Sequence, residues 1–162
     1  MNERYRVRIE KDTLVFSAGH FITFAGNICE RLHGHNYRVA AEVSGPLDEN
    51  HYVVDFIALR DSLAAIMREL DHYMLLPTRH PQIVVRADDR EVTATFEDRR
   101  WVFPRGDCVL LEVPNTTAEM LARHIGQRLL AELQHRGLAT PDSLRIDVDE
   151  CYGQVGVYEW RR

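Results

Sequence analysis

Three of the eight histidines lie within the first 35 residues, at a spacing that could hold a metal ion. His33 and His35 flank Gly34, and alternate residues of a β-strand point to the same side, so both imidazoles could reach one ion. A glycine between them allows another backbone to come close. His20 stands at the end of the preceding predicted strand and is a candidate third ligand. Three histidines with an open fourth position are typical of a catalytic zinc site, and the alternative is a pair of strand histidines with local hydrogen bonds.

Two further groups near these histidines could transfer protons. Cys29 precedes His33 by four residues, and a bound cation should lower the pKa of its thiol, which makes it a candidate base or nucleophile. The alternative is that Cys29 is a small buried apolar residue. Asp71 and His72 close the first predicted helix, where the helix dipole favours a charged imidazole that Asp71 could orient. Such a pair is also an ordinary way to end a helix.

Glu150 occupies an unusual position for a carboxylate. It continues the apolar face that Leu144, Ile146 and Val148 form on the last long strand. A carboxylate on such a face is costly unless it is paired, and when aimed into a site it can accept two parallel N–H bonds from a guanidine-like ring edge. The alternative is that the strand has already left the core at Glu150.

The hydrophobic periodicity predicts the strands that would position these residues. Alternation with a period of two predicts strands over residues 5–17, 33–44, 144–152 and 155–160. On the second of these, His33 and His35 share the face of Tyr37 and the apolar residues that follow it. A loop of small residues, which includes His20, separates the first two strands.

Two helices complete the core elements. Asp55 can cap a helix that runs to about Leu70 with one apolar stripe. Thr116 and Glu119 form a Thr-x-x-Glu capping box for a second helix, and Gly137 suits its C-terminal cap. The start of this helix could also offer backbone N–H groups to a ligand.

The stretch 82–111 predicts additional β-structure, with β-branched residues around an Asp88-Asp89 turn. The order strand, strand, helix, extra β-structure, helix, strand, strand is typical of an α+β domain. We therefore expect a single domain over residues 1–162.

The composition excludes several classes of protein. A chain of 162 residues with 45% hydrophobic and 28% charged residues fits one compact domain and is neither disordered nor collagen-like. No apolar run approaches the ~20 residues that span a bilayer, so no membrane association is expected. The N-terminus lacks the apolar core of a signal peptide. The net charge of −5 and the scattered basic residues argue against a nucleic-acid partner.

The three cysteines, Cys29, Cys108 and Cys151, are far apart in the chain. An odd number without a signal peptide argues against a disulfide framework, and the absence of a CxxC pair argues against a thiolate zinc knuckle. We expect a reducing, cytoplasmic location, with Cys108 and Cys151 as packing residues.

Taken together, these residues resemble the 6-pyruvoyltetrahydropterin synthase family, which includes the 6-carboxytetrahydropterin synthases of the queuosine pathway. The resemblance covers nearly the whole chain in several ordered blocks. These blocks are Phe16-Ser17-Ala18-Gly19-His20, Cys29-Glu30-Arg31-Leu32-His33-Gly34-His35-Asn36-Tyr37, Val54-Asp55-Phe56, Leu70-Asp71-His72, Asn115-Thr116-Thr117-Ala118-Glu119 and Asp149-Glu150.

The resemblance implies a tunnelling fold. In this fold a ββααββ protomer has an antiparallel sheet with two helices on one face, and the sheets of several protomers join into a barrel. The usual assembly is a homohexamer of two stacked trimers, with sites at the interfaces between protomers.

The resemblance also implies a role for each candidate residue. Zinc would bind His20, His33 and His35. Cys29 would be the general base, activated by a relay of Asp71 and His72. Glu150 would anchor the pterin ring, helped by Thr117 and Glu119.

The implied activity is that of a zinc-dependent lyase. It would convert 7,8-dihydroneopterin triphosphate to 6-carboxytetrahydropterin or 6-pyruvoyltetrahydropterin with loss of triphosphate, zinc acting as a Lewis acid. A rival from another class is a noncatalytic pterin-binding or zinc-stabilised assembly protein. A second rival is an aldolase or cyclohydrolase on the same fold.

Two features depart from the short queuosine-type members. The stretch 82–111 is longer than they require, and Glu30 directly follows Cys29. In one branch of the family a glutamate at this place replaces the cysteine, in enzymes that cleave the side chain to 6-hydroxymethyl-dihydropterin for folate synthesis. The presence of both residues resembles the dual-type members. Adjacent residues of a regular strand point to opposite faces, so if both Cys29 and Glu30 serve the site, the backbone from Asn27 to Arg31 must form a loop or bulge. The alternative is that Glu30 is an exposed charge paired with Arg31 or another arginine.

Overall fold

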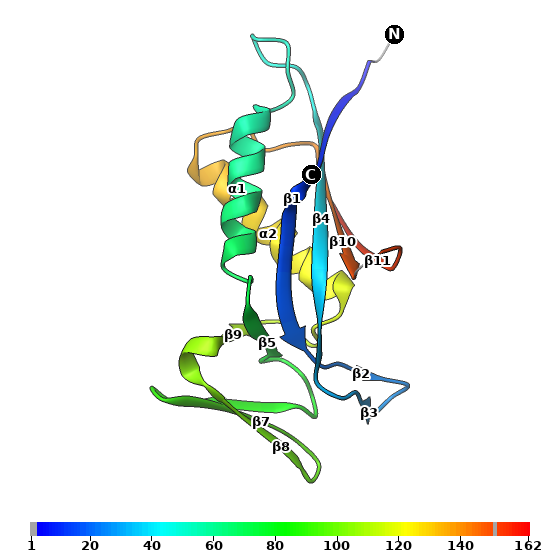
Figure 1. The fold of residues 1–162 in the computed structure, drawn as a ribbon. Helices are drawn as coiled ribbons and strands as arrows, with labels where there is room; N and C mark the ends of the chain where they lie inside the picture. The colour runs from blue at the N-terminus through cyan, green and yellow to red at the C-terminus, as the bar shows by residue number, and fades with distance from the viewer. Residues whose placement is uncertain (1–2, 151) are drawn as a thin grey trace.

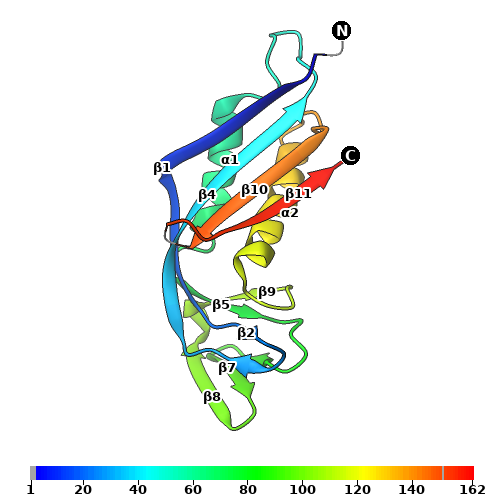
Figure 2. The ribbon, with the colours of Figure 1, turned by 90° about the vertical axis from the view of Figure 1, so that its right-hand side faces the viewer.

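The computed structural model describes residues 3–150 and 152–162, which form an α+β architecture. Six strands make the main sheet: β1 (Tyr5–His20), β4 (His33–Gly45), β5 (Tyr73–Pro77), β9 (Cys108–Leu111), β10 (Ser143–Glu150) and β11 (Val155–Arg161). Their order across the sheet is β11-β10-β4-β1-β5-β9. Two helices, α1 (Phe56–Arg68) and α2 (Ala118–His135), cover one face, and the opposite face carries no helix (Figures 1 and 2).

Antiparallel pairing of β1 with β4 forms the centre of the sheet and extends to residues 20 and 33 at its end. The register shifts between Glu10 and Val15, which lets Leu14 and Phe16 face the core together with Ile9. The strand predicted over residues 5–17 is therefore confirmed and continues for three more residues to the end of β1.

The core lies between the sheet and the helices. Leu59 and Leu63 on α1 and Leu121 and Ile125 on α2 are fully buried against the sheet. Asp55 caps α1 as predicted, because its Oδ1 accepts from the backbone N–H groups of residues 57 and 58 at 2.6 and 3.3 Å. Among the described residues, no helix is both long enough and apolar enough to cross a membrane.

The first helix is shorter than expected. It ends at Arg68 rather than at about Leu70, so Asp71 and His72 lie in the turn before β5. His72 has a positive φ of 65°, which no helical residue adopts. The prediction that Asp71 and His72 close this helix is therefore wrong.

The N-terminus of the second helix differs from the predicted capping box by one residue. Thr117, not Thr116, is the N-cap, and its Oγ1 accepts from the N–H of Met120 at 3.4 Å. The C-terminal prediction is confirmed: Gly137 has a φ of +73° and donates its N–H to Gln134 O at 2.9 Å.

The extra β-structure forms a separate antiparallel sheet of β6 (Val84–Ala87), β7 (Glu91–Phe96) and β8 (Arg99–Pro104). A second core cluster lies beneath it and includes Phe21, Ile83 and Phe96. The predicted turn is present, since Asp88 Oδ1 accepts from Arg90 N at 2.8 Å and from the following N–H at 2.9 Å.

The sheet is mixed, whereas the sequence predicted an antiparallel one. β5 pairs in parallel with β1 and with β9, so residues 82–104 belong to the crossover between two parallel strands. β5 was not predicted, because its buried apolar run does not alternate. Cys108 is buried in β9, as a packing residue should be, and Cys151 lies outside the described residues.

Candidate active site

The three histidines converge at one end of the β1–β4 pair. His20 lies directly opposite His33, and Ala18 lies opposite His35. The imidazole centroids are 4.8 Å apart for His20 and His33, 5.2 Å for His20 and His35, and 4.9 Å for His33 and His35. One ring nitrogen from each lies within 4.8 Å of the others. The structure thus brings together the residues that the sequence proposed as a metal site.

Gly34 allows the two strands to approach at this point. A Cβ atom on residue 34 would lie 2.9 Å from the carbonyl oxygen of Ala18, closer than such atoms normally come. The absence of a side chain therefore keeps β4 close enough to β1 for the flanking histidines to reach His20.

Backbone carbonyls orient two of the imidazoles. Nδ1 of His20 lies 2.8 Å from Thr116 O, and Nδ1 of His33 lies 2.8 Å from Arg31 O. A carbonyl can only accept, so each Nδ1 carries the proton and each Nε2 presents a lone pair. Burial lowers the pKa of His20 to about 4, so its ring is neutral at pH 7, the form that binds metals. The Nε2 of His20 accepts a hydrogen bond from the Tyr37 hydroxyl at 3.2 Å.

This donor set fits a divalent transition metal. Three neutral imidazoles suit zinc, and nitrogen ligands of a tetrahedral zinc ion lie about 3.4 Å apart, so only a small closure of the rings is required. Three protein ligands also leave a fourth position open for a substrate oxygen. Within residues 3–150 and 152–162, no other group of three or more potential ligand side chains is this close.

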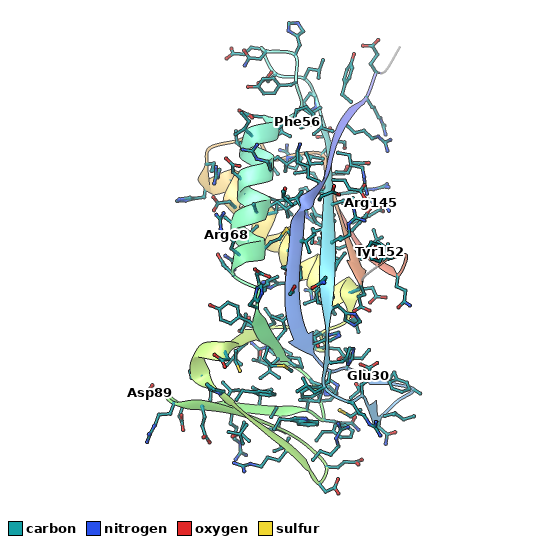
Figure 3. The ribbon with its side chains drawn as sticks, in the orientation of Figure 1. Glu30, Phe56, Arg68, Asp89, Arg145 and Tyr152 are labelled. Atoms are coloured by element: carbon teal, nitrogen blue, oxygen red, sulfur yellow. The ribbon has the colours of Figure 1, made fainter. Side chains whose placement is uncertain are left out.

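Glu30 faces the histidine cluster. Its Oε2 lies 3.8 Å from His33 Nε2 and 3.4 Å from the N–H of Ile22. Its own N–H donates to Ile22 O at 2.9 Å, which holds the backbone that carries the carboxylate. Among the recorded contacts of the described residues, the Glu30 carboxylate lies beside His33 rather than beside Arg31. In Figure 3, Glu30 lies in the lower half of the view, whereas Phe56 lies near the top.

Cys29 lies in the short strand β3 (Ile28–Cys29), which pairs with β2 (Thr23–Phe24). Its side chain packs against the cluster beneath the extra sheet, and its Sγ lies 3.6 Å from Glu30 O. Burial raises the pKa of the thiol, and the nearby Glu30 and Glu97 carboxylates add to this effect, while Arg99 opposes it. The sequence predicted that a bound cation would lower the pKa of the Cys29 thiol. Without a bound cation, the surroundings of Cys29 raise this pKa instead.

Asp71 and His72 form a tight pair. Nδ1 of His72 lies 2.9 Å from Asp71 Oδ2, and the N–H of Ser17 donates to Asp71 Oδ1 at 2.8 Å. The Ser17 N–H, and then His72, lower the pKa of the Asp71 carboxyl. The His72 side chain is 80% exposed and lines an open groove of about 650 Å³ with Ser17 and Asn36. In the described part of the protomer, no recorded contact joins this pair to Cys29.

Glu150 lies at the end of β10, opposite Tyr37 of β4. Its Oε2 is 4.0 Å from His35 Nε2, and its side chain is only 19% exposed. Burial raises the pKa of Glu150, while His35 opposes this effect and the Glu30 and Glu119 carboxylates add to it. Glu150 is thus partly buried with its carboxylate near His35, which favours the interpretation that it faces a site.

Thr116 is a residue of the site whose role the sequence did not predict. It is fully buried, its hydroxyl donates to Phe21 O at 3.3 Å, and its carbonyl orients His20. Because the Thr116 carbonyl contacts His20, the N-terminus of α2, with Thr117 as its cap and Glu119 in its first turn, lies beside His20. The capping-box motif located the right segment but assigned the wrong threonine as the cap.

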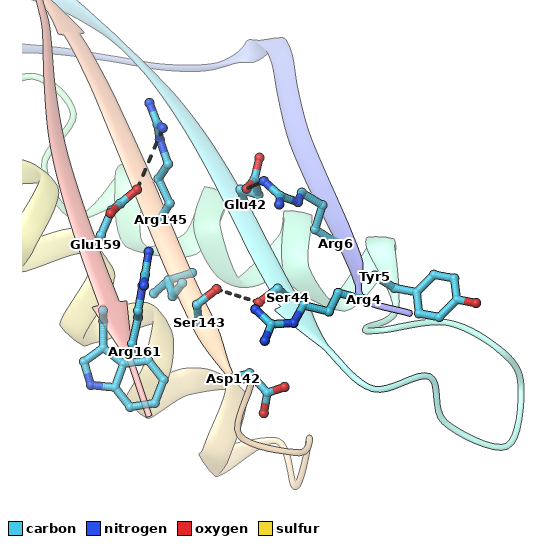
Figure 4. A pocket seen from close by; sticks show the side chains of 12 residues that line it. Arg4, Tyr5, Arg6, Glu42, Ser44, Asp142, Ser143, Arg145, Glu159 and Arg161 are labelled. Carbon is cyan, nitrogen blue, oxygen red and sulfur yellow. Dashed lines mark hydrogen bonds and ion pairs between the residues drawn. The ribbon is translucent and has the colours of Figure 1, made fainter. Parts of the chain in front are cut away.

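A second cavity, of about 270 Å³, lies at the opposite end of the sheet (Figure 4). Its arginines are partly neutralised, since Arg6 pairs with Glu42 at 3.2 Å and Arg145 with Glu159 at 3.9 Å. It contains no residue of the histidine cluster, so the candidate active site is the cluster itself and the surfaces beside it.

Comparisons with known proteins agree with this geometry. The family model described as 6-pyruvoyl tetrahydropterin synthase matches residues 8–159. A Methanocaldococcus jannaschii protein, provisionally assigned as a 6-carboxy-5,6,7,8-tetrahydropterin synthase, is 30% identical over 146 residues, which cover 90% of this chain and 89% of that protein. The Aquifex aeolicus 6-carboxy-5,6,7,8-tetrahydropterin synthase is 28% identical over 81% of this chain and 76% of its own length.

Solved structures of the same kind superpose closely. Plasmodium vivax 6-pyruvoyltetrahydropterin synthase matches with a TM-score of 0.91 and 25% identity over 99% of this chain and all of that one, in variants that replace a catalytic glutamate by alanine or cysteine. The Plasmodium falciparum enzyme matches with a TM-score of 0.89 and 27% identity, again over 99% of this chain and all of that one. The predicted tunnelling fold is therefore confirmed.

Proposed function

Because this chain belongs to the 6-pyruvoyl tetrahydropterin synthase family and is an enzyme of the tetrahydropterin synthase type, we propose that it is a zinc-dependent lyase acting on 7,8-dihydroneopterin triphosphate. The product we propose first is 6-carboxytetrahydropterin, for queuosine biosynthesis, or 6-pyruvoyltetrahydropterin. The pyruvoyl product forms with loss of triphosphate alone, and the one-carbon carboxy product forms with loss of triphosphate, uptake of water and release of the other two side-chain carbons as acetaldehyde. The observation that carries the proposal is the convergence of three histidines with the half-buried carboxylates of Glu30 and Glu150.

Separate groups of residues would bind the metal and the pterin ring. His20, His33 and His35 would hold Zn²⁺, which when bound supplies Lewis-acid polarisation of a side-chain oxygen of the substrate. Glu150 would accept N–H bonds from the pterin ring, and the N-terminus of α2, with Thr117 and Glu119, would line the ring's other edge. These contacts would fix the ring so that its side chain extends toward the histidines.

Proton transfer is assigned to Cys29, Glu30, Asp71 and His72. The thiolate of Cys29, activated by the Asp71–His72 pair, would remove a carbon-bound proton on the route to the carboxy or pyruvoyl product. Because no recorded contact joins this pair to Cys29 in residues 3–150 and 152–162, we propose that the relay is completed across an interface between protomers.

A second candidate activity is side-chain cleavage to 6-hydroxymethyl-7,8-dihydropterin for folate synthesis. One observation favours it: the Glu30 carboxylate, and not the Cys29 thiol, lies beside His33. The closely superposing Plasmodium vivax structures also concern a catalytic glutamate. We propose that Glu30 is the base for this cleavage.

The oligomeric assembly and the cellular location of the protein are also proposed. Strands β11 and β9 leave both edges of the main sheet unpaired within the protomer, which suits joining of sheets in a homohexamer of two trimers. Cys29 and Cys108 carry free thiols, which suits a reducing cytoplasm. We propose no nucleic-acid or membrane partner.

A direct assay tests the activity. Zinc-loaded protein incubated with 7,8-dihydroneopterin triphosphate should release triphosphate and yield one or both pterin products, identified by mass. A noncatalytic pterin-binding protein would bind the substrate and return it unchanged, and that result would refute the proposed function.

Glu150→Gln should weaken pterin binding and leave zinc in place. The carboxamide keeps the size of the side chain but loses the charge that strengthens two N–H bonds, at a cost of about 2 kcal/mol or roughly 30-fold in Kd. Titration calorimetry with a nonreactive pterin measures the affinity. Glu159→Gln on the neighbouring strand is the matched control, because Glu159 pairs with Arg145 far from the histidines. An unchanged affinity in Glu150→Gln would count against the assignment.

A further inference from the structure

The extra sheet makes one specific contact with the segment that carries Cys29 and Glu30. Arg99, at the start of β8, donates from Nη1 to Cys29 O at 2.8 Å and from Nη2 to Glu30 O at 2.9 Å. Cys29 is the last residue of β3 and Glu30 follows it, so both carbonyls lie where the pairing of β3 with β2 ends. One planar guanidinium thus holds two successive carbonyls of the active-site segment.

Arg99 is itself held in place. Its guanidinium lies 4.6 Å from the ring centroid of Trp101, and Trp101 stacks on Phe21 with centroids 4.3 Å apart and planes at 23°. Phe21 is fully buried and directly follows His20 in the chain. The aromatic stack therefore links the hairpin of β7 and β8 to the end of β1 that carries a histidine of the cluster.

We propose that Arg99 is a positioning residue. Its two hydrogen bonds to the Cys29 and Glu30 carbonyls fix the backbone of this segment, and the Glu30 carboxylate is thereby held facing the histidine cluster. The other supports of Glu30 are local, since both come from Ile22 in the same loop. Arg99 adds two direct hydrogen bonds from a separate sheet to this loop. This assigns a function to the crossover between β5 and β9, and the catalytic part of the inference rests on the function proposed above.

The chain offers a matched set of variants. Arg99→Met removes both donors and keeps the aliphatic stem against Trp101. Arg99→Lys keeps the charge, but a single ammonium lacks the planar fork that reaches two carbonyls at once. Arg100→Met is the control, because it removes the same charge as Arg99→Met at the next residue. Arg100 is exposed and points to the other side of β8.

Two measurements on the full-length protein test the inference. Hydrogen exchange of the peptide that covers residues 27–32 should be roughly tenfold faster or more in Arg99→Met, intermediate in Arg99→Lys and unchanged in Arg100→Met. With 7,8-dihydroneopterin triphosphate, kcat should fall about 10- to 100-fold in Arg99→Met with KM within about twofold, because a displaced base lowers reactivity more than binding.

The outcomes separate this inference from the proposed function. If hydrogen exchange of residues 27–32 is unchanged in Arg99→Met, Arg99 does not hold this backbone, and the inference is overturned whatever the activity. Faster exchange with an unchanged kcat overturns the positioning role. If the wild type leaves the substrate unaltered, the proposed function fails, and with it the role of Arg99 in positioning a catalytic base. The hydrogen-exchange data would still show whether Arg99 holds the backbone of residues 27–32. Faster exchange throughout the protein would indicate general destabilisation and would also contradict the inference.

Discussion

Replacing His33 and His35 together by alanine should abolish both zinc binding and lyase activity. His20 alone would then remain of the three ligands, and one imidazole cannot hold zinc against the cell's other ligands. The single variant His33→Ala should also bind zinc much more weakly. The loss should exceed the roughly 10- to 100-fold decrease in affinity that follows removal of a residue hydrogen-bonded to a metal ligand. Metal analysis of the purified protein should give close to one zinc per wild-type protomer.

The control for these variants is His51→Ala, because His51 is an exposed histidine in the loop before α1. It should keep its zinc and its activity. Circular dichroism should show that the double variant remains folded, since the sheet and helices enclose a large apolar core that does not include the histidine rings. Full zinc retention in the double variant would refute the site.

The histidine cluster could be predicted from sequence because its geometry is local. His33 and His35 lie on one regular strand, so a period of two places them on the same side without knowledge of the rest of the fold. His20 required only the assumption that the two strands pair, which is the usual arrangement of consecutive strands. The same alternation placed Glu150 on the buried face of its strand.

Other parts of the fold depended on contacts between distant segments. The run of β5 is buried on both faces and joins the sheet through parallel pairs, so it lacks the alternation that marks an exposed strand. Thr116 and Thr117 are equally plausible caps by residue type, but the Thr116 hydroxyl donates to the distant Phe21 O, and the Thr117 hydroxyl caps the helix. The contact of Arg99 with Cys29 spans 70 residues and leaves no local pattern.

The neighbouring residues Cys29 and Glu30 should control different products. Their side chains point to different surroundings: the carboxylate lies beside His33, and the thiol packs beneath the extra sheet. Glu30→Gln keeps the size of the side chain and removes the base, so cleavage to 6-hydroxymethyl-7,8-dihydropterin should fall by roughly 10²- to 10⁴-fold. Cys29→Ala should suppress the carboxy or pyruvoyl product and retain cleavage.

The measurement is the ratio of the two products, determined by mass spectrometry from one reaction mixture for each variant. A ratio is informative because partial unfolding or loss of zinc lowers both products together, whereas loss of one base changes their proportion. Arg31→Ala is the matched control, since Arg31 is exposed, adjoins Glu30, and its recorded contact with the site in the described part of the chain is through its backbone carbonyl, which the substitution retains. If Glu30→Gln leaves the product distribution of the wild type unaltered, Glu30 is only a charged neighbour of His33, and the proposal of two bases for two products fails.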